Sequence, residues 1–289
     1  MTRLSESIKW VIVVMISCVF SPSVLASEKA VLKIAMLHLE LKYADLEHNA
    51  NLIEAGIERA SKEGADWLLT PELALTGYRF DLKIGTDWIT PGPDAYVERM
   101  QRLAKKYEIT LFFSHLEGIP TAPKGLHTSV VFNTLFVIDR SGKIIGRHRK
   151  INTIPVAEDW SAVGTEATVV TVDQQKVGLL ICADAWPREH AQILKQQGAD
   201  IILSSASWAP GEYGPGDVWE KRSLETGLPL FVNNRTGIER QFDLRQSVSV
   251  VSHGGQRLFS HRSEGSRLVI ISWNSTENVL VEHSTFGLP

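Results

Sequence analysis

Apolar residues in this chain alternate between short runs that fit strands and longer segments with helical spacing. Residues 31–37 form an apolar run with one interruption, and residues 67–70 form a second, so we expect a strand at each. Between them, residues 46–62 place apolar or small side chains three or four positions apart. That spacing predicts a helix with one buried face and one charged face.

The same alternation continues to the end of the chain. We expect further helices at 96–106, 189–197 and 219–226, and further strands at 109–114, 134–139, 143–147, 177–181, 200–205, 228–233, 247–252, 257–261 and 267–272. Ser141-Gly142 predicts a hairpin turn, and the last three strands are expected to pair with one another. With no short repeat and no low-complexity linker, the pattern indicates one layered α/β domain.

One of the buried runs ends at a cysteine. Residues 177–181 lead directly into Cys182, and Pro187 then precedes a helical pattern. This predicts a strand that ends in a tight turn with the thiol at its tip. Backbone N–H groups and a helix N-terminus near such a thiol favour the thiolate, although a lone cysteine is more often an inert core residue.

The composition is that of a globular chain without a strongly charged surface. The 289 residues are 44% hydrophobic, which is enough for one large core or two modest ones. The formal net charge is -3 and the pI is about 6.3. This charge gives no electrostatic reason to expect nucleic acid as a partner.

Residues 1–26 are expected to be a signal peptide, which leaves residues 27–289 as the exported domain. The segment has a basic start, an apolar run over residues 10–20 that is too short to span a bilayer well, and small residues before a cleavage point after Ala26. The expected location is periplasmic or secreted, with no integral span beyond the signal. Two alternatives stay open, a lipid anchor at Cys18 and an uncleaved signal that tethers the protein.

Export makes the remaining cysteine more informative. The chain has two cysteines, and if Cys18 leaves with the signal, Cys182 has no intramolecular partner in an oxidising compartment. One unpaired thiol adds no structural link there, so a chemical role for Cys182 is favoured.

Two further ionisable residues occur beside predicted strands. Glu72 lies between Pro71 and an apolar segment, where a carboxylate needs a partner or a raised pKa; this suits a general base, and a structural ion pair is the plain alternative. Lys150 ends the basic cluster 147–150. Such clusters are mostly solvated, so the cluster alone does not point to function.

Three motifs occur in a recognisable order: Thr70-Pro71-Glu72-Leu73-Ala74-Leu75-Thr76-Gly77-Tyr78, then Arg149-Lys150, then Gly178 to Asp184. Together they resemble the nitrilase superfamily of carbon-nitrogen hydrolases, in its amidase-like branch. Each motif alone is weak, but the ordered set is specific and spans nearly all of the chain after the signal.

The resemblance implies a four-layer αββα sandwich, no cofactor, no metal and a Glu-Lys-Cys triad. Glu72 would be the general base, Cys182 the nucleophile and Lys150 the cation that stabilises the tetrahedral intermediate. Glu158 falls where the family has a supporting glutamate, and the backbone N–H of Ala183 would complete an oxyanion hole. The resemblance also implies a homodimer or larger homo-oligomer formed through the helices after the cysteine.

Some positions depart from the family pattern. Asn152 stands where a histidine is common, and Ala183-Asp184 replaces the residues typical of amidases or of nitrilases. Tyr78, Asp184, Trp208 and Tyr213 are candidates to border the substrate pocket, although Trp208 is equally well explained as core.

The expected activity is hydrolysis of a small linear amide through a thioester on the cysteine, releasing ammonia or an amine and a carboxylic acid. Two alternatives are open, a nitrilase or an N-carbamoyl hydrolase. A catalytically silent binding module on the same fold is the alternative from another class.

Overall fold

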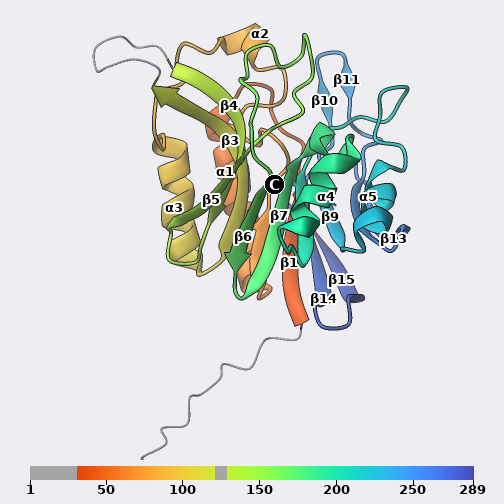
Figure 1. The fold of residues 1–289 in the computed structure, drawn as a ribbon. Coiled ribbons are helices and arrows are strands. Elements are labelled where there is room, and N and C mark those ends of the chain that lie inside the picture. Colours follow the sequence, from red (N-terminus) through yellow and green to blue (C-terminus); the bar gives the residue numbers. More distant parts are fainter. Residues whose placement is uncertain (1–30, 121–128) are drawn as a thin grey trace, which may run out of the picture.

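Two β-sheets lie face to face between two layers of helices in the computed structural model, which describes residues 31–120 and 129–289 (Figure 1). The predicted signal peptide at 1–26 lies outside the described residues. Within the described ranges, no helix is both long and apolar enough to cross a membrane.

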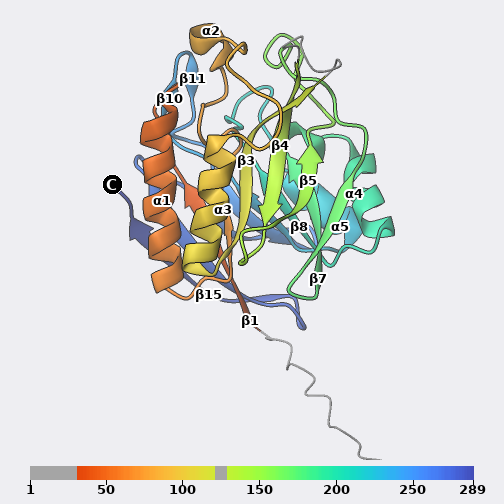
Figure 2. The same cartoon turned by 90° about the vertical axis from the view of Figure 1, so that its left-hand side faces the viewer.

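The first sheet has seven strands, and its outer face is covered by two long helices (Figure 2). The strands, in spatial order, are β15 (Val279–Gly287), β14 (Arg267–Asn274), β1 (Val31–His38), β2 (Trp67–Leu69), β3 (Thr110–Pro120), β4 (Ser129–Ile138) and β5 (Ile144–Arg149). The helices are α1 (Leu46–Lys62) and α3 (Ala95–Tyr107), and the short helix α2 (Asp81–Ile84) lies beyond the strand ends.

The second sheet has six strands and carries its own pair of helices on the opposite side of the molecule (Figure 1). Its strands are β13 (Gln256–His261), β12 (Ser249–His253), β9 (Leu230–Asn233), β8 (Ile201–Ser205), β7 (Gln175–Ile181) and β6 (Thr168–Val172). The helices are α4 (Arg188–Gln196) and α5 (Val218–Thr226), and a small hairpin joins β10 (Ile238–Glu239) to β11 (Phe242–Asp243).

Alternate residues of the central strands pack into different layers. On β1, Ile34 and Met36 join the core between the two sheets, whereas Ala35 and Leu37 pack with the helix α1 layer. A strand that is buried on both faces has no polar side, which explains the continuous apolar runs in the sequence. The expectation of a four-layer αββα sandwich is confirmed.

The pairing predicted for the last three strands is wrong in one respect. β12 pairs with β13, as expected, but β14 leaves this sheet and pairs antiparallel with β1 over its whole length. The physical reason is burial, since β14 is apolar on both faces and takes a central place between β1 and β15. β6 and β15 were not predicted; most β15 side chains are exposed, so β15 lacks the apolar run that marks a buried strand.

Candidate active site

The carboxyl ends of strands from both sheets meet at one place in the sandwich. β1, β2 and β3 run parallel to one another, as do β7, β8 and β9. Glu72 follows β2, Lys150 follows β5 and Cys182 follows β7. Side chains that lie far apart in the sequence are thus brought to one edge, where α/β proteins commonly place their sites.

A fully buried charge cluster forms the base of the site. Lys150 Nζ lies 2.7 Å from Glu72 Oε1 and 2.7 Å from Glu158 Oε2. Asn133 Nδ2 donates to both carboxylates, at 2.9 Å and 3.0 Å. The other oxygen of Glu72 accepts from the backbone N–H of Ser207 at 3.0 Å. The structure therefore brings together three of the predicted residues, Glu72, Lys150 and Glu158.

The cluster contains two carboxylates and one ammonium group, so it carries an excess negative charge away from water. Burial raises the pKa of Glu72, and the charge of Glu158 adds to the shift, against the opposing effect of Lys150. The pKa of Lys150 rises well above its ordinary value; burial would lower it, but Glu72 and Glu158 outweigh that effect. The lysine is therefore a permanent cation, and Glu72 is a stronger base than an exposed glutamate.

Cys182 lies at the tip of the strand-to-helix turn that the sequence predicts. It begins a short 3-10 helix, Cys182–Ala185, and has a φ of 49°, which is unusual for a non-glycine residue. Leu73, directly after Glu72, has a φ of 50°, so backbone strain is found beside two of the candidate catalytic side chains.

Burial and the nearby carboxylate of Glu72 raise the pKa of the Cys182 thiol well above its usual range, while Lys150 and the backbone of Ser207 act in the opposite direction. The thiol is accordingly neutral before substrate arrives. It needs a base to remove its proton before it can attack a carbonyl carbon.

Asp184 belongs to the same short helix as Cys182 and is fully buried. Its Oδ1 accepts from the backbone N–H groups of Ile151 and Asn152, at 2.9 Å and 2.7 Å. Its Oδ2 accepts from His148 Nε2 at 2.8 Å and from the backbone N–H of Ile181 at 3.0 Å. Burial opposes ionisation, but the hydrogen bond from His148 and the other donors lower the pKa of Asp184.

The prediction that Asp184 borders the substrate pocket is therefore corrected. All of these contacts turn its carboxylate inward, and it is absent from the residues that line the cavity above Cys182. Its observed contacts tie the segment after Lys150 to the turn that carries Cys182. Asp184 thus positions the two segments relative to each other.

Asn152, which replaces a residue common in the family, makes a second tie between the same segments. Its Nδ2 donates to the carbonyl oxygen of Ala183 at 2.8 Å. That carbonyl also accepts from the backbone N–H of Trp186 at 2.9 Å. The peptide groups around Ala183 are thereby held in one orientation.

A cavity of about 470 Å³ opens above Cys182 and Ala183. The predicted pocket residues Tyr78, Trp208 and Tyr213 all contribute to its lining. Trp208 is nearly buried and packs against Trp186 with ring centroids 5.5 Å apart, while Tyr213 is exposed at the rim. The buried charge cluster lies directly beneath this lining: Lys150 Nζ is 5.6 Å from the ring centroid of Tyr78, and the charges of the cluster act on the thiol of Cys182.

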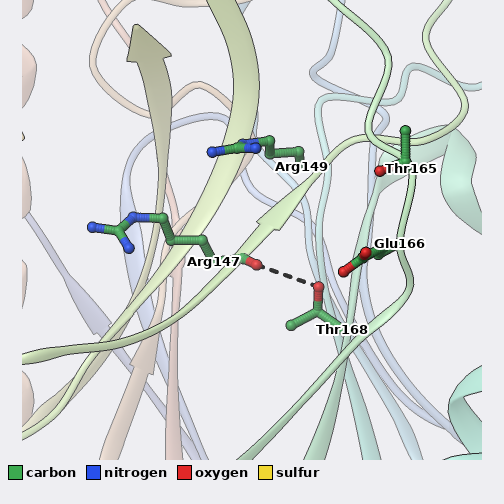
Figure 3. Close-up of a pocket in the computed structure, with 5 residues that line it drawn as sticks. All are labelled: Arg147, Arg149, Thr165, Glu166 and Thr168. Atoms are coloured by element: carbon green, nitrogen blue, oxygen red, sulfur yellow. Dashed lines mark hydrogen bonds between the residues drawn. The ribbon is translucent and has the colours of Figure 1, made fainter. Parts of the chain in front are cut away.

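A second hollow, of about 280 Å³, lies beside β5 (Figure 3). In Figure 3 the guanidinium groups of Arg147 and Arg149 point away from Glu166 and Thr168. Both arginines instead form ion pairs with Glu117. The hollow therefore presents no convergent set of reactive groups. In the described part of the chain, no cluster of three or more His, Cys, Asp or Glu side chains could hold a metal ion.

Three contributors to the site were not predicted from the sequence: Asn133, His148 and the backbone of Ser207. Asn133 did carry a signal, since it is a polar residue within the apolar strand β4. His148 also had one, because alternation along β5 turns its side chain to the same face as Leu135 and not to solvent. The backbone N–H of Ser207 had no signal in the sequence that would mark it as part of the site.

Comparison with known proteins gives consistent results along most of the chain. The family model described as carbon-nitrogen hydrolase matches residues 33–281. The chain is 27% identical over 268 residues to the citrullinase of Francisella tularensis, covering 85% of this chain and 90% of the relative. It is 28% identical over 181 residues to the 2-oxoglutaramate amidase of Bacillus subtilis, covering 61% of this chain and 64% of the relative.

A solved structure has the same fold. The crystal structure of an amidase from Nesterenkonia sp. superposes with a TM-score of 0.70 at 24% identity, covering 84% of this chain and 90% of that one. A related structure of that amidase is described as showing covalent addition of the acetamide moiety of fluoroacetamide at its active-site cysteine.

Proposed function

The chain belongs to the carbon-nitrogen hydrolase family, and from that premise we propose that it hydrolyses the carbon-nitrogen bond of a small linear amide through a thioester on Cys182. One observation carries the proposal. A permanent ammonium, Lys150 Nζ, is held 2.7 Å from two buried carboxylates beneath a cavity whose lining includes the only thiol of the described residues.

In the first half of the reaction Glu72 takes the thiol proton and the sulfur of Cys182 forms a bond to the amide carbon. The carbonyl oxygen becomes an anion, which needs donors already in place. Lys150 has three N–H bonds and two are used by Glu72 and Glu158, so one remains for this oxygen. The backbone N–H of Ala183 is the second donor.

The carbon-nitrogen bond then breaks, and Glu72 returns the proton to the departing nitrogen as ammonia or an amine leaves. Water attacks the thioester and gives its proton to Glu72. The carbon-sulfur bond breaks, the carboxylic acid leaves and the thiol of Cys182 is restored. A base with a raised pKa suits this cycle, because it must both accept and return a proton near neutral pH.

Ammonia release from purified residues 27–289 tests the proposal. The panel contains short amides, ω-amides, nitriles and N-carbamoyl compounds, and each is measured beside the Cys182→Ala variant. Acid and ammonia from amides alone support an amidase, while turnover of a nitrile, or release of carbon dioxide as well, favours the nitrilase or carbamoyl alternative.

Trapping of the intermediate tests the thioester. We expect mass spectrometry of acid-quenched enzyme to show the mass of one acyl group on the peptide that contains Cys182. An intact, reduced enzyme that releases nothing from any compound would favour the silent binding module.

A further inference from the structure

We propose that the cavity above Cys182 selects amides whose substituent is uncharged and apolar, and that it rejects amides carrying a free carboxylate. This inference deepens the proposed function and rests on it.

The wall of the cavity is aromatic and aliphatic. Trp186, Trp208, Tyr78 and Phe242 supply ring surface, and Ile154 and Ala157 supply aliphatic surface. The ring centroids of Tyr78 and Phe242 are 6.1 Å apart at nearly a right angle, so these two aromatic side chains support each other. A substituent with an alkyl or phenyl group would replace water along this wall.

The inner wall is held in place by hydrogen bonds that leave its apolar faces free. The backbone N–H of Trp208 donates to Asn234 Oδ1 at 3.0 Å, and Asn234 Nδ2 donates back to the carbonyl of Trp208 at 2.9 Å. The indole N–H of Trp208 donates to the carbonyl of Tyr213 at 2.8 Å. With its N–H engaged, Trp208 offers ring surface to a ligand.

The described residues that line the cavity offer no cation to a carboxylate. Among the described residues that line the cavity there is neither arginine nor lysine, and the charged one is Glu212, an exposed acid at the rim. Lys150 lies beneath the floor, is fully buried and already contacts Glu72 and Glu158. Its remaining N–H is assigned to the carbonyl oxygen of the scissile amide.

The electrostatic field of the site also opposes the carboxylate of a ligand. The buried cluster has two carboxylates against one ammonium, and Glu212 adds another negative charge at the mouth. A carboxylate that enters such a cavity loses water and gains no counter-charge, which is an unfavourable exchange. A methyl group at the same position meets no such cost.

Two amides of equal length test the proposal, pentanamide and 4-carbamoylbutanoate, which differ in a terminal methyl or carboxylate. We expect kcat/KM for pentanamide to exceed that for the carbamoyl acid by about 100-fold or more, since an unpaired ion in such a site costs several kcal/mol. Equal or faster hydrolysis of the carbamoyl acid would overturn the inference while leaving the amidase function intact.

A charge change at the rim provides the matched variants. In Glu212→Arg we expect the preference for pentanamide to shrink by about tenfold, and in Glu212→Gln by less, since only the former adds a cation. An unchanged preference in Glu212→Arg would show that rim charge does not govern selection and would contradict the electrostatic argument.

Binding separates failure of this inference from failure of the proposed function. Calorimetry with Cys182→Ala measures each amide without turnover, and we expect heat of binding for pentanamide and none for 4-carbamoylbutanoate at the same concentrations. Tighter binding of the carbamoyl acid would overturn the inference. If no amide is hydrolysed but this binding difference holds, the proposed reaction fails and the selectivity of the cavity stands.

Discussion

Glu72 follows strand β2, whereas Asp184 belongs to the short helix that begins at Cys182, and both carboxylates are completely buried. Burial raises the pKa of Glu72, which shares one ammonium with Glu158. Asp184 accepts hydrogen bonds from four donors, and its pKa is lowered although it is as completely buried as Glu72. Burial alone therefore does not decide the charge preference of a carboxylate: Glu72 accepts from three donors but has the charge of Glu158 beside it, whereas at Asp184 the donors outweigh burial.

The two carboxylates therefore suit two different roles around Cys182, one structural and one in proton transfer. An ion that is fully satisfied has no reason to exchange protons, so Asp184 is suited to hold segments in place. A carboxylate within a cluster of excess negative charge accepts a proton readily, so Glu72 is suited to take one from a thiol. Mutation of Glu72 should consequently lower mainly the reaction rate, and mutation of Asp184 should lower mainly the stability of the fold.

The largest expected effect is on rate, from Glu72→Gln. Without a base for the thiol proton, we expect kcat/KM for the best amide to fall by about 1,000-fold. The free energy of unfolding should fall by less than in Asp184→Asn, because the amide turns one N–H toward a donor but the change also removes excess buried charge. The rate comes from ammonia release and the stability from urea unfolding, with exposed Glu166→Gln as control. A marked loss of stability would place Glu72 in the structural class with Asp184.

The next effect is on stability, from Asp184→Asn. The amide group would turn an N–H toward a donor such as His148 or the backbone of Ile181, so we expect a loss of about 3 kcal/mol in the free energy of unfolding. Urea unfolding measures it. Asp243→Asn, at an exposed carboxylate paired with Arg245, is the matched control and should change stability little. Equal losses in both variants would contradict the role assigned to Asp184.

Both carboxylates lie within motifs visible in the sequence, but the sequence did not show where the side chain of Asp184 points. Glu72 stood out because an acid among apolar residues must be either paired or unusually basic. Asp184 was placed at the pocket because it follows Cys182, but its direction depends on a turn whose geometry the sequence does not encode locally. The burial of Lys150 was not evident from its surroundings in the sequence, because a basic cluster such as 147–150 is usually solvated. In the structure, strand alternation buries Lys150 and His148 and leaves Arg147 exposed.

The fold followed from local patterns as far as the elements were concerned. Helix α1 has the predicted bounds, 46–62, because its apolar spacing is unambiguous. The partner of β14 was not predictable in the same way, since apolarity on both faces shows that a strand is central but does not show in which of two sheets. Contacts across the sandwich, such as Ser207 to Glu72, depend on that global choice.

A smaller effect is expected from Asn152→Ala, because the Asn152 side chain contacts the turn that holds Cys182 and Asp184. The variant loses one hydrogen bond to the carbonyl of Ala183, at a half-buried position. We expect a loss of about 1 kcal/mol in the free energy of unfolding, and a decrease in kcat of about fivefold if the same energy is lost in orienting the oxyanion donor. Asn152→His keeps a donor and should recover part of the rate, whereas equal activity of the two variants would rule out the hydrogen bond as the cause.

The smallest effect is on the pH dependence of stability, to which the two carboxylates contribute with opposite signs. The folded-state pKa of Asp184 lies below its unfolded value, so its contribution to stability is complete above the unfolded value and is lost as pH falls through the folded one. For Glu72 the shift has the opposite sign: the folded protein holds the proton more tightly, so stability decreases as pH rises from the ordinary glutamate range through the raised pKa.

Unfolding free energies measured by urea across acidic pH separate these contributions. We expect Asp184→Asn to flatten the loss of stability at the acid end, and Glu72→Gln to remove the decline that accompanies rising pH. In the unmodified enzyme kcat/KM should fall as pH drops through the raised pKa of Glu72, at a pH above the ordinary glutamate range, because the protonated carboxyl cannot accept the thiol proton. An acid limb at the ordinary glutamate position would mean that Lys150 and the hydrogen-bond donors fully offset burial at Glu72, which would contradict the raised pKa on which its role as a base rests.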